Sequence, residues 1–269
     1  EANKRPRSAG SIRINTNLEH LDIDSCIKET SNKLISHLNY KSIETKKYLI
    51  CFSPESFLQL INSFSSMFNA RSIIDGISLM DENSIGKQIS VRNLNISDEG
   101  LHPENVGAFS FDGEGTPTQN INIIKSGILT NLIHSEATAR RFGVKPTGHA
   151  GLGAKVSVSP DWLVVSKCKT ITDKDESLCI KKTDKEYILI DELSALHSGV
   201  KASQGSFSLP FDGWIVNNGK KLSIDAATVA GDILKVLNSI VKIENEQCVT
   251  HQGISPYVWV ENVSITGEA

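Results

Sequence analysis

Residues 108–150 read AFSFDGEGTPTQNINIIKSGILTNLIHSEATARRFGVKPTGHA, and this stretch decides the local fold around it. Two apolar runs flank Ser126-Gly127, a spacing that predicts a β-hairpin closed by a tight glycine turn. Ser135 is placed to cap a following helix, because its hydroxyl can accept an amide proton of the first helical turn. Gly143 is suited to end that helix, since glycine adopts the left-handed conformation without a Cβ clash. The stretch therefore predicts strand, turn, strand and short helix.

Two helices and one strand are predicted upstream of this stretch. Asp22 or Asp24 caps a first helix that runs to about Leu38. A short apolar strand at residues 48–52 is followed by a second helix at residues 54–68, because a serine cap and a proline in the first turn both favour a helix start. Apolar residues spaced i, i+3, i+4, i+7 and i+11 predict its buried face. They are Phe57, Leu60, Ile61, Phe64 and Phe68.

Strands dominate the pattern from about Ile89 onward. Apolar runs rich in β-forming residues predict strands near residues 162–165, 187–190, 214–216 and 257–260. Asn217-Asn218-Gly219 indicates a further hairpin turn. One late helix is expected to start at an Asp225 cap, with a buried face that consists of Val229, Ile233, Val236, Leu237 and Ile240. The predicted fold class is α+β, mainly an antiparallel sheet with a few helices.

Composition limits the classes of function. The chain has 269 residues, and its net charge of −3 gives no global field that would favour nucleic acid. No apolar run approaches the ~20 residues needed to cross a bilayer, so no membrane partner is expected. Five scattered cysteines in a chain of this length indicate free thiols in a reducing compartment, and the expected location is the cytoplasm.

Five sub-motifs in residues 108–150, in order and at the right spacing, resemble the signature of the TldD/PmbA family. They are Phe111-Asp112-Gly113-Glu114-Gly115, Pro117-Thr118-Gln119, Ser126-Gly127, Ala139-Arg140 and Thr147-Gly148-His149-Ala150. The resemblance continues through a glycine-containing block at residues 199–240 and a closing strand at residues 257–267. It implies a half-barrel-like C-terminal domain over residues 44–269. Residues 1–43 are then expected to be a linker and connecting helix that follow an N-terminal α/β domain, which this sequence lacks.

The family has two types. In one, a helix carries His-Glu-x-x-x-His, and these histidines bind zinc together with a later cysteine, while the glutamate activates water. In the other, the PmbA or TldE type, that helix lacks the motif and the protein pairs with a zinc-bearing subunit. The equivalent helix here, residues 54–68, contains no histidine, and Cys248-x-x-His251 supplies half of a zinc-site spacing. We therefore expect no metal and no cofactor in this chain, and zinc in a partner subunit.

Six residues are candidates for contact with a peptide. Asp112 and Glu114 sit among glycines, so they either form a turn or contact a peptide amine or a partner subunit. His134 precedes a helix start and His149 lies in a glycine turn, where a hydrogen-bonding structural role competes with acid–base chemistry. Gly205 and Ser206 belong to the second family block, where Ser206 either faces the peptide or is an ordinary strand residue. No catalytic residue is assigned.

The resemblance implies a PmbA/TldE-like non-metal subunit of a metallopeptidase assembly that processes or degrades unfolded or modified peptides. The expected partner is a TldD-like zinc-bearing subunit, or a second copy in a homodimer, and the chain is not expected to be catalytic alone. An alternative from another class is a non-catalytic regulatory protein, in line with the family's older label as a modulator of DNA gyrase.

Overall fold

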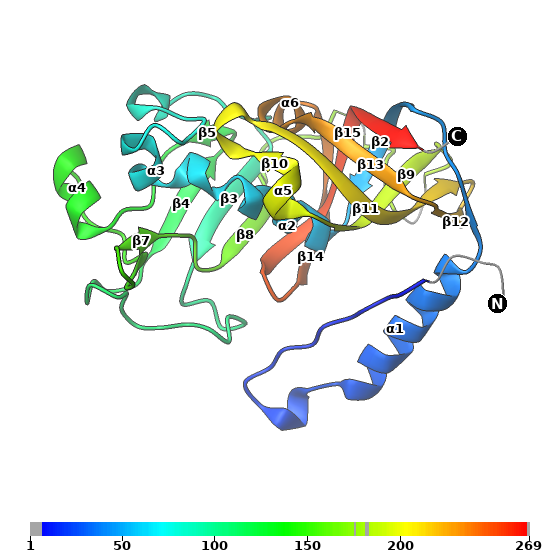
Figure 1. Ribbon diagram of the computed structural model, residues 1–269, viewed down its shortest axis with the longest axis horizontal. Coiled ribbons are helices and arrows are strands. Elements are labelled where there is room, and N and C mark those ends of the chain that lie inside the picture. Colours follow the sequence, from blue (N-terminus) through cyan, green and yellow to red (C-terminus); the bar gives the residue numbers. More distant parts are fainter. Residues whose placement is uncertain (1–6, 175, 181–182, 268–269) are drawn as a thin grey trace.

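The computed structural model describes residues 7–174, 176–180 and 183–267, and shows the mixed α+β fold that the sequence predicts (Figure 1). The helices are α1 (Ile23–His37), α2 (Pro54–Ser63), α3 (Ala70–Ile74), α4 (Glu136–Phe142), α5 (Leu196–Gly199) and α6 (Ile233–Asn238), with short 3-10 helices at Leu18–His20, Ser65–Phe68, Glu82–Ser84 and Ala202–Gln204. No helix among these described residues is long and apolar enough to cross a membrane.

Strands form most of the molecule. They are β1 (Tyr40–Lys41), β2 (Lys46–Phe52), β3 (Leu94–Glu99), β4 (Asn120–Lys125), β5 (Ile128–Leu129), β6 (Ala150–Gly151), β7 (Ser157–Val158), β8 (Leu163–Lys167), β9 (Tyr187–Leu193), β10 (Val200–Lys201), β11 (Ser206–Asn217), β12 (Lys220–Ile224), β13 (Ala227–Asp232), β14 (Ile240–Val249) and β15 (Gly253–Gly267). All except β6 and β7 join one large sheet within the described part of the chain.

Five strands of this sheet close into a barrel. The pairs run β11–β9–β2–β15–β13 and return to β11, so each of the five strands is paired on both sides. Closure leaves these strands without a free edge. Most pairs are antiparallel, as predicted, but β2–β9, β15–β8 and β1–β12 are parallel. The half-barrel expected from the family is thus a closed barrel with an extension.

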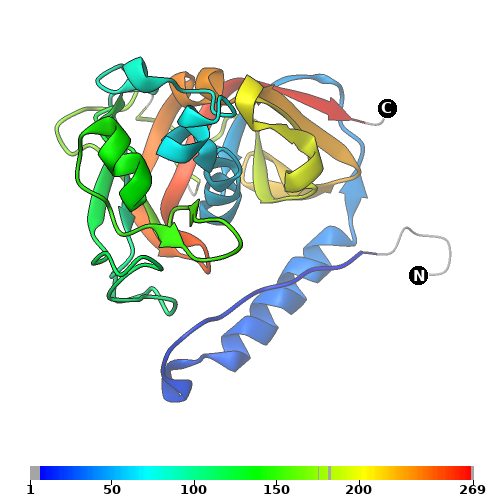
Figure 2. The same cartoon turned by 60° about the vertical axis from the view of Figure 1, so that its left-hand side comes forward.

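The extension carries the signature stretch. From β15 the sheet continues through β8, β3 and β4 to β5, which lies at its end. Figure 2 shows this part of the molecule turned toward the viewer, with α4 beside it. A single apolar core joins the barrel to the extension, because the inward residues of both belong to one cluster of buried side chains. The signature stretch is therefore held on a rigid sheet.

Helix α2 packs against the barrel strands β15 and β9, and all five residues of its predicted apolar face are buried. Ser53 caps the helix by accepting the Ser56 N–H, and Pro54 occupies the first turn, as predicted. The α-helix ends at Ser63, and a 3-10 turn at Ser65–Phe68 continues the buried path to Phe68. The sequence pattern thus identified the face correctly and overestimated the length of the regular helix.

The late helix predicted from Asp225 is wrong in its first half. Residues 227–232 form β13, which closes the barrel between β11 and β15. The helix begins later, at Ile233, and its cap is Asp232, whose carboxylate accepts the Lys235 N–H. Apolar residues at this spacing fit both the helical and the strand periodicity. Pairing on two sides with long strands overrides the local helical pattern.

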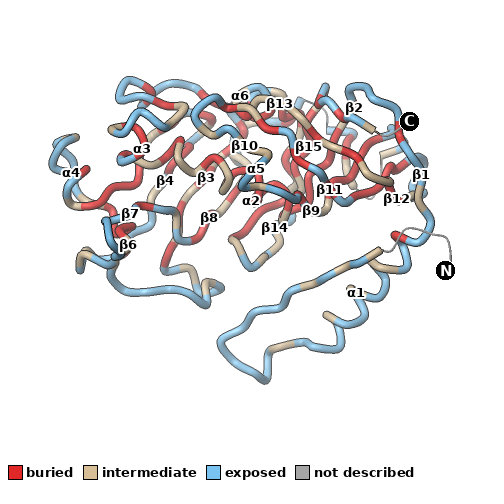
Figure 3. The backbone as a smooth tube through the Cα atoms, viewed as in Figure 1, coloured by how far each residue is buried: buried red, intermediate tan, exposed pale blue. Residues whose placement is uncertain are grey.

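Helix α1 extends away from the body of the molecule (Figures 1 and 2). Asp22 caps it, as predicted, but its apolar residues are largely exposed, as the pale tube in Figure 3 shows. It contacts the body near its C-terminal end. Lys33 forms an ion pair with Asp191, and the buried His37 lies with Nδ1 2.8 Å from Ser223 Oγ.

Candidate functional site

The signature stretch folds as its sequence predicts. The β4–β5 turn consists of Ser126 and Gly127, with φ values of 50° and 79°, the two positive angles that a tight hairpin of this kind requires. Ser135 and Thr138 form a capping box at the start of α4, and Gly143 ends this helix in the left-handed conformation. The hairpin turn, the helix cap and the glycine that ends the helix together set the direction in which residues 144–151 return toward the start of the stretch.

A close backbone contact joins the two ends of the signature. Gly148 has φ +75°, and a Cβ atom on it would lie 2.4 Å from the Pro117 carbonyl oxygen. Only glycine fits this approach. The Gly113 N–H donates to the Ala150 carbonyl at 2.7 Å, a second link across the same contact. The turn at residues 147–150 is therefore packed directly on residues 113–118.

Asp112 is a turn residue, as its position among glycines predicts. Its Oδ1 accepts the N–H groups of Glu114 and Thr116, each at 2.9 Å, and its Oδ2 accepts the Ala150 N–H at 2.9 Å. Glu114 reaches the other way, with Oε2 accepting the Glu136 N–H at 2.8 Å at the start of α4. A carboxylate is favourable there because the first-turn N–H groups carry partial positive charge. Both acids thus fix the loop.

His149 is part of a buried charged cluster. Its Nδ1 lies 2.9 Å from Thr147 Oγ1 and its Nε2 lies 3.3 Å from Asp98 Oδ2. The side chains of His149 and Asp98 are fully buried. Burial lowers the pKa of His149, but Asp98, together with Asp161 and the Thr147 backbone, outweighs burial and leaves the pKa above its usual value. Asp98 also accepts the N–H groups of Asp161 and Trp162 at 2.8 and 2.9 Å. Asp98 therefore connects β3, β8 and the signature turn.

Sequence reasoning missed Asp98, although a signal was present. In β3 the residues Leu94, Ile96 and Asp98 are buried at every second position. Because side chains alternate across a strand, an aspartate in the apolar register points into the core. A charge at such a position needs a partner. The sequence did not show that the partner is His149.

Two further groups at this cluster have displaced pKa values. Partial burial raises the pKa of Asp161 to about 6; His149 acts in the opposite direction, and the carboxylates of Asp98 and Asp112 raise the pKa further. Burial lowers the pKa of His134 to about 4, and the neighbouring His149 adds to this effect. His134 is therefore neutral at pH 7, with its ring edge against Phe142 at 5.2 Å between centroids. Clustered displaced pKa values are typical of functional sites.

A pocket of about 350 Å³ opens beside this cluster, between the loops at residues 100–118 and 148–161. Its lining includes Asp112 and His149 from the candidate set, together with Asp161. Glu114 and His134 lie next to it without lining it. Gly205 and Ser206 lie elsewhere, at the start of β11 beside α6, where the Gly205 carbonyl accepts the Ile233 N–H at 2.8 Å. The structure thus gathers four of the six candidates.

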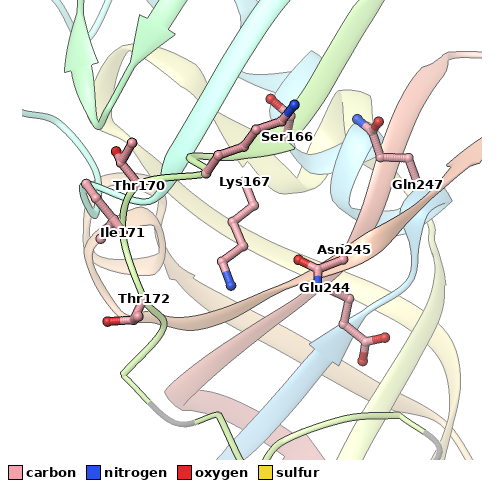
Figure 4. A pocket seen from close by; sticks show the side chains of 9 residues that line it. Ser166, Lys167, Thr170, Ile171, Thr172, Glu244, Asn245 and Gln247 are labelled. Atoms are coloured by element: carbon pink, nitrogen blue, oxygen red, sulfur yellow. The ribbon is translucent and has the colours of Figure 1, made fainter.

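A second hollow, of about 480 Å³, lies between residues 166–172 and 244–247. Figure 4 shows Thr170, Ile171 and Thr172 on one side, and Glu244, Asn245 and Gln247 on the other. Two of its charged side chains, Lys167 and Glu244, already have partners. Lys167 forms an ion pair with Asp173 at 2.7 Å, and Glu244 accepts the Ile180 N–H and the Trp259 Nε1–H at 2.8 and 3.0 Å. The pocket beside Asp98 and His149 is the stronger candidate, because its Asp161 carboxylate accepts no bond from the described residues.

Helix α2 meets the β14–β15 turn through a polar network. Glu55 Oε1 lies 3.5 Å from His251 Nδ1 and accepts a hydrogen bond from Gln252 Nε2 at 2.8 Å. Asn62 donates to Gln252 Oε1 at 3.3 Å. Burial raises the pKa of Glu55, and His251 acts in the opposite direction. Across the described residues, no three or more His, Cys, Asp or Glu side chains gather closely enough to hold a metal ion.

The fold and the site define a class: α+β domains in which a five-stranded barrel continues into a sheet that ends in a hairpin, a short helix and a glycine turn. The model of the PmbA/TldA metallopeptidase C-terminal domain matches residues 45–267. The chain belongs to this family, and the resemblance seen in the sequence is confirmed.

The chain is similar in sequence to several proteins named as metalloproteases. It is 26% identical to metalloprotease PmbA of Escherichia coli O157:H7 over 222 residues, which cover 81% of this chain and 45% of that protein. It is 23% identical to the metalloprotease PmbA homolog of Buchnera aphidicola subsp. Baizongia pistaciae over 260 residues, covering 96% and 55%. With a Synechocystis metalloprotease the match is 28% over 144 residues, 53% of this chain and 31% of that one. The chain thus spans between about a third and about half of these relatives.

Solved structures share the fold. The crystal structure of a candidate modulator of a DNA gyrase from Thermotoga maritima has a TM-score of 0.83 and 27% identity, covering 93% of this chain and 56% of that one. TldE from Thermococcus kodakarensis has a TM-score of 0.77 and 19% identity, covering 92% and 56%.

Proposed function

We propose that this chain is a PmbA/TldE-like subunit without its own metal, acting in a metallopeptidase assembly that processes or degrades unfolded or modified peptides. Family membership over residues 45–267 supports the peptidase context, and the names of the E. coli and Buchnera relatives agree with it. We assign the protein to the cytoplasm. Residues 1–43 act as linker and connecting helix in this proposal.

The network around Glu55 carries the proposal. By the resemblance to the family, helix α2 corresponds to the helix that bears the zinc motif in the other type, and the β14–β15 region, with Cys248, corresponds to the region of the later zinc-binding cysteine. In this chain the facing groups are one glutamate, one histidine and two amides, joined by hydrogen bonds. Amide side chains are poor zinc ligands compared with histidine and cysteine. This composition favours a subunit that relies on zinc in its partner.

The partner we propose is a TldD-like zinc-bearing subunit, with a second copy of this chain as the alternative. β14 pairs with β15 along one side in the described sheet, whereas the backbone of β5, at the end of the sheet, already bonds with Gly86 and Lys87. Edge strands bind extended peptides by main-chain hydrogen bonds with little dependence on side-chain sequence. Such edges suit a subunit that guides unfolded peptides toward a catalytic zinc elsewhere in the assembly.

Co-expression with a TldD-like protein from the same organism tests the proposal. Zinc content and cleavage of an unfolded peptide are measured for the chain alone, for the partner alone and for the co-purified pair. We expect association, with zinc and cleavage accompanying the partner. Two matched controls are a partner variant without its motif histidines, which should associate without cleaving, and His251→Gln in this chain, which should leave zinc content unchanged. One zinc per chain in this protein alone would overturn the proposal. Absence of association and cleavage would favour the regulatory alternative.

A further inference from the structure

Large apolar side chains stand exposed around the pocket beside Asp98 and His149. Phe109 is 76% exposed, Phe111 65% and Leu152 72%, and all three line the pocket. Exposed side chains of this size around a hollow mark a binding surface, whereas scattered single ones need no explanation. They come from both walls, Phe109 and Phe111 from the loop after β3 and Leu152 from the loop after β6.

The pocket is acidic as well as apolar. Backbone N–H groups already donate to both oxygens of Asp112 and of the buried Asp98, but the side chain of Asp161 accepts no bond from the described residues. Two carboxylates line the pocket, those of Asp112 and Asp161. Its one imidazole, His149, already faces the buried carboxylate of Asp98, and no lysine or arginine lines the pocket within the described chain. The fully buried His149 also lines the pocket, and its Nε2 makes no hydrogen bond of good geometry. The charge balance therefore favours a cationic ligand.

The walls are fixed before any ligand arrives. Thr118 Oγ1 donates to the Phe109 carbonyl at 2.7 Å, and Asn105 Nδ2 donates to the Gly100 carbonyl at 2.7 Å. A Cβ atom on Gly100 would lie 2.9 Å from Asp161 Oδ2, so the glycine lets the loop pass close to the carboxylate. A pre-organised wall lowers the entropy lost on binding. The hollow thus has the character of a built site.

We propose that this pocket binds the N-terminal end of a peptide, with its ammonium group at the Asp161 carboxylate and its first apolar side chain against Phe109, Phe111 and Leu152. A metal ion fits less well, because Asp161 is the one carboxylate here that is not already used by backbone donors. A volume of about 350 Å³ lies at the small end of ligand pockets and suits the terminal residues of a chain. This inference deepens the proposed function by naming which end of a peptide the subunit holds.

Fluorescence anisotropy with the chain alone tests this site. The probe is Phe-Leu-Gly-Gly with a fluorophore at its C-terminus, compared with the same peptide acetylated at its N-terminus. We expect acetylation to weaken binding at least tenfold, and Asp161→Asn to weaken the free-amine peptide to a similar level with little effect on the acetylated one. Phe109→Ser should weaken both peptides. Asp75→Asn, at the end of α3, is the matched control and should leave both affinities unchanged.

Three results would overturn the site. Equal affinity for the free and acetylated peptides would exclude recognition of the amine. Unchanged binding in Asp161→Asn would place the amine elsewhere. Absence of peptide binding, together with a dimer that Phe109→Ser dissociates in sedimentation, would make the apolar walls an interface between copies. Because no partner subunit takes part, these outcomes are separate from the zinc and association readouts of the proposed function.

Discussion

Replacing Asp98 is the sharpest test of the buried cluster. In Asp98→Ala the N–H groups of Asp161 and Trp162 lose their acceptor, and His149 loses the carboxylate 3.3 Å from its Nε2. An unsatisfied buried donor costs about 1–3 kcal/mol, and breaking a buried pair by removing one partner costs about 3–5 kcal/mol. The two effects share one side chain and do not add. We expect a loss of about 3–5 kcal/mol in the free energy of unfolding, and about 2 kcal/mol for Asp98→Asn, which retains one oxygen acceptor.

Urea unfolding followed by tryptophan fluorescence measures this loss, with the buried Trp162 as a reporter next to the cluster. The matched control is Asp75→Asn, which removes an aspartate from the exposed ion pair with Arg71 and should leave the midpoint unchanged. NMR titration provides a second readout: the pKa of His149 should fall in Asp98→Asn, because burial then acts without its counterion. Stability of Asp98→Ala within about 1 kcal/mol of the parent, at an unchanged urea slope, would refute the reasoning.

Three further predictions concern single positions. Gly148→Ala should destabilise the fold by about 3 kcal/mol or more, because the added Cβ would meet the Pro117 carbonyl at a positive φ. Gly143→Ala, with open space around it, should cost about 1 kcal/mol. Urea unfolding measures both losses, and equal losses would contradict the prediction. His134 has a pKa of about 4 in the folded state, below its unfolded value, so the unfolded state binds more protons between pH 6.5 and 4 and the free energy of unfolding falls as pH falls. His134→Gln should flatten this dependence of the free energy of unfolding on pH, and an unchanged dependence would exclude the effect. Cys168, whose pKa is lowered by its hydrogen bond with Thr170, should react with iodoacetamide before the buried Cys51, whose pKa is raised by burial. Mass spectrometry of partly labelled protein gives the order of labelling, and early labelling of Cys51 would contradict the prediction.

Local chemistry explains which parts of the fold were predictable. The Ser126-Gly127 turn, the Ser135 cap and the Gly143 stop depend on a few neighbouring residues, so their sequence signals survive in the structure. β13 was misread because its apolar spacing fits two periods, and the choice between them depends on β11 and β15. The exposed apolar residues of α1 were likewise unpredictable, since periodicity shows a face and not what covers it.

The candidate site likewise contains residues that the sequence could predict and residues that it could not. His149 and Asp112 were found because they belong to a motif, and the turn role of Asp112 follows from the glycines beside it. Asp161 carried no signal of its own, since its importance arises from β8 lying next to β3 in the sheet. The candidacy of Gly205 and Ser206 came from the family block, and the structure places them outside the pocket.

By itself the sequence determined the family, the α+β class and the local geometry of the signature stretch, because caps, turns and motif spacing act over a few residues. The tertiary structure alone decided that the barrel closes through β13 and that Asp112, His149 and Asp161 meet at one pocket, with the buried Asp98 against His149. These residues are far apart in the chain, and their meeting depends on strand register and on the close approach of Gly148 to Pro117. Charge pairing inside a core is a property of such long-range contacts, which no local pattern encodes.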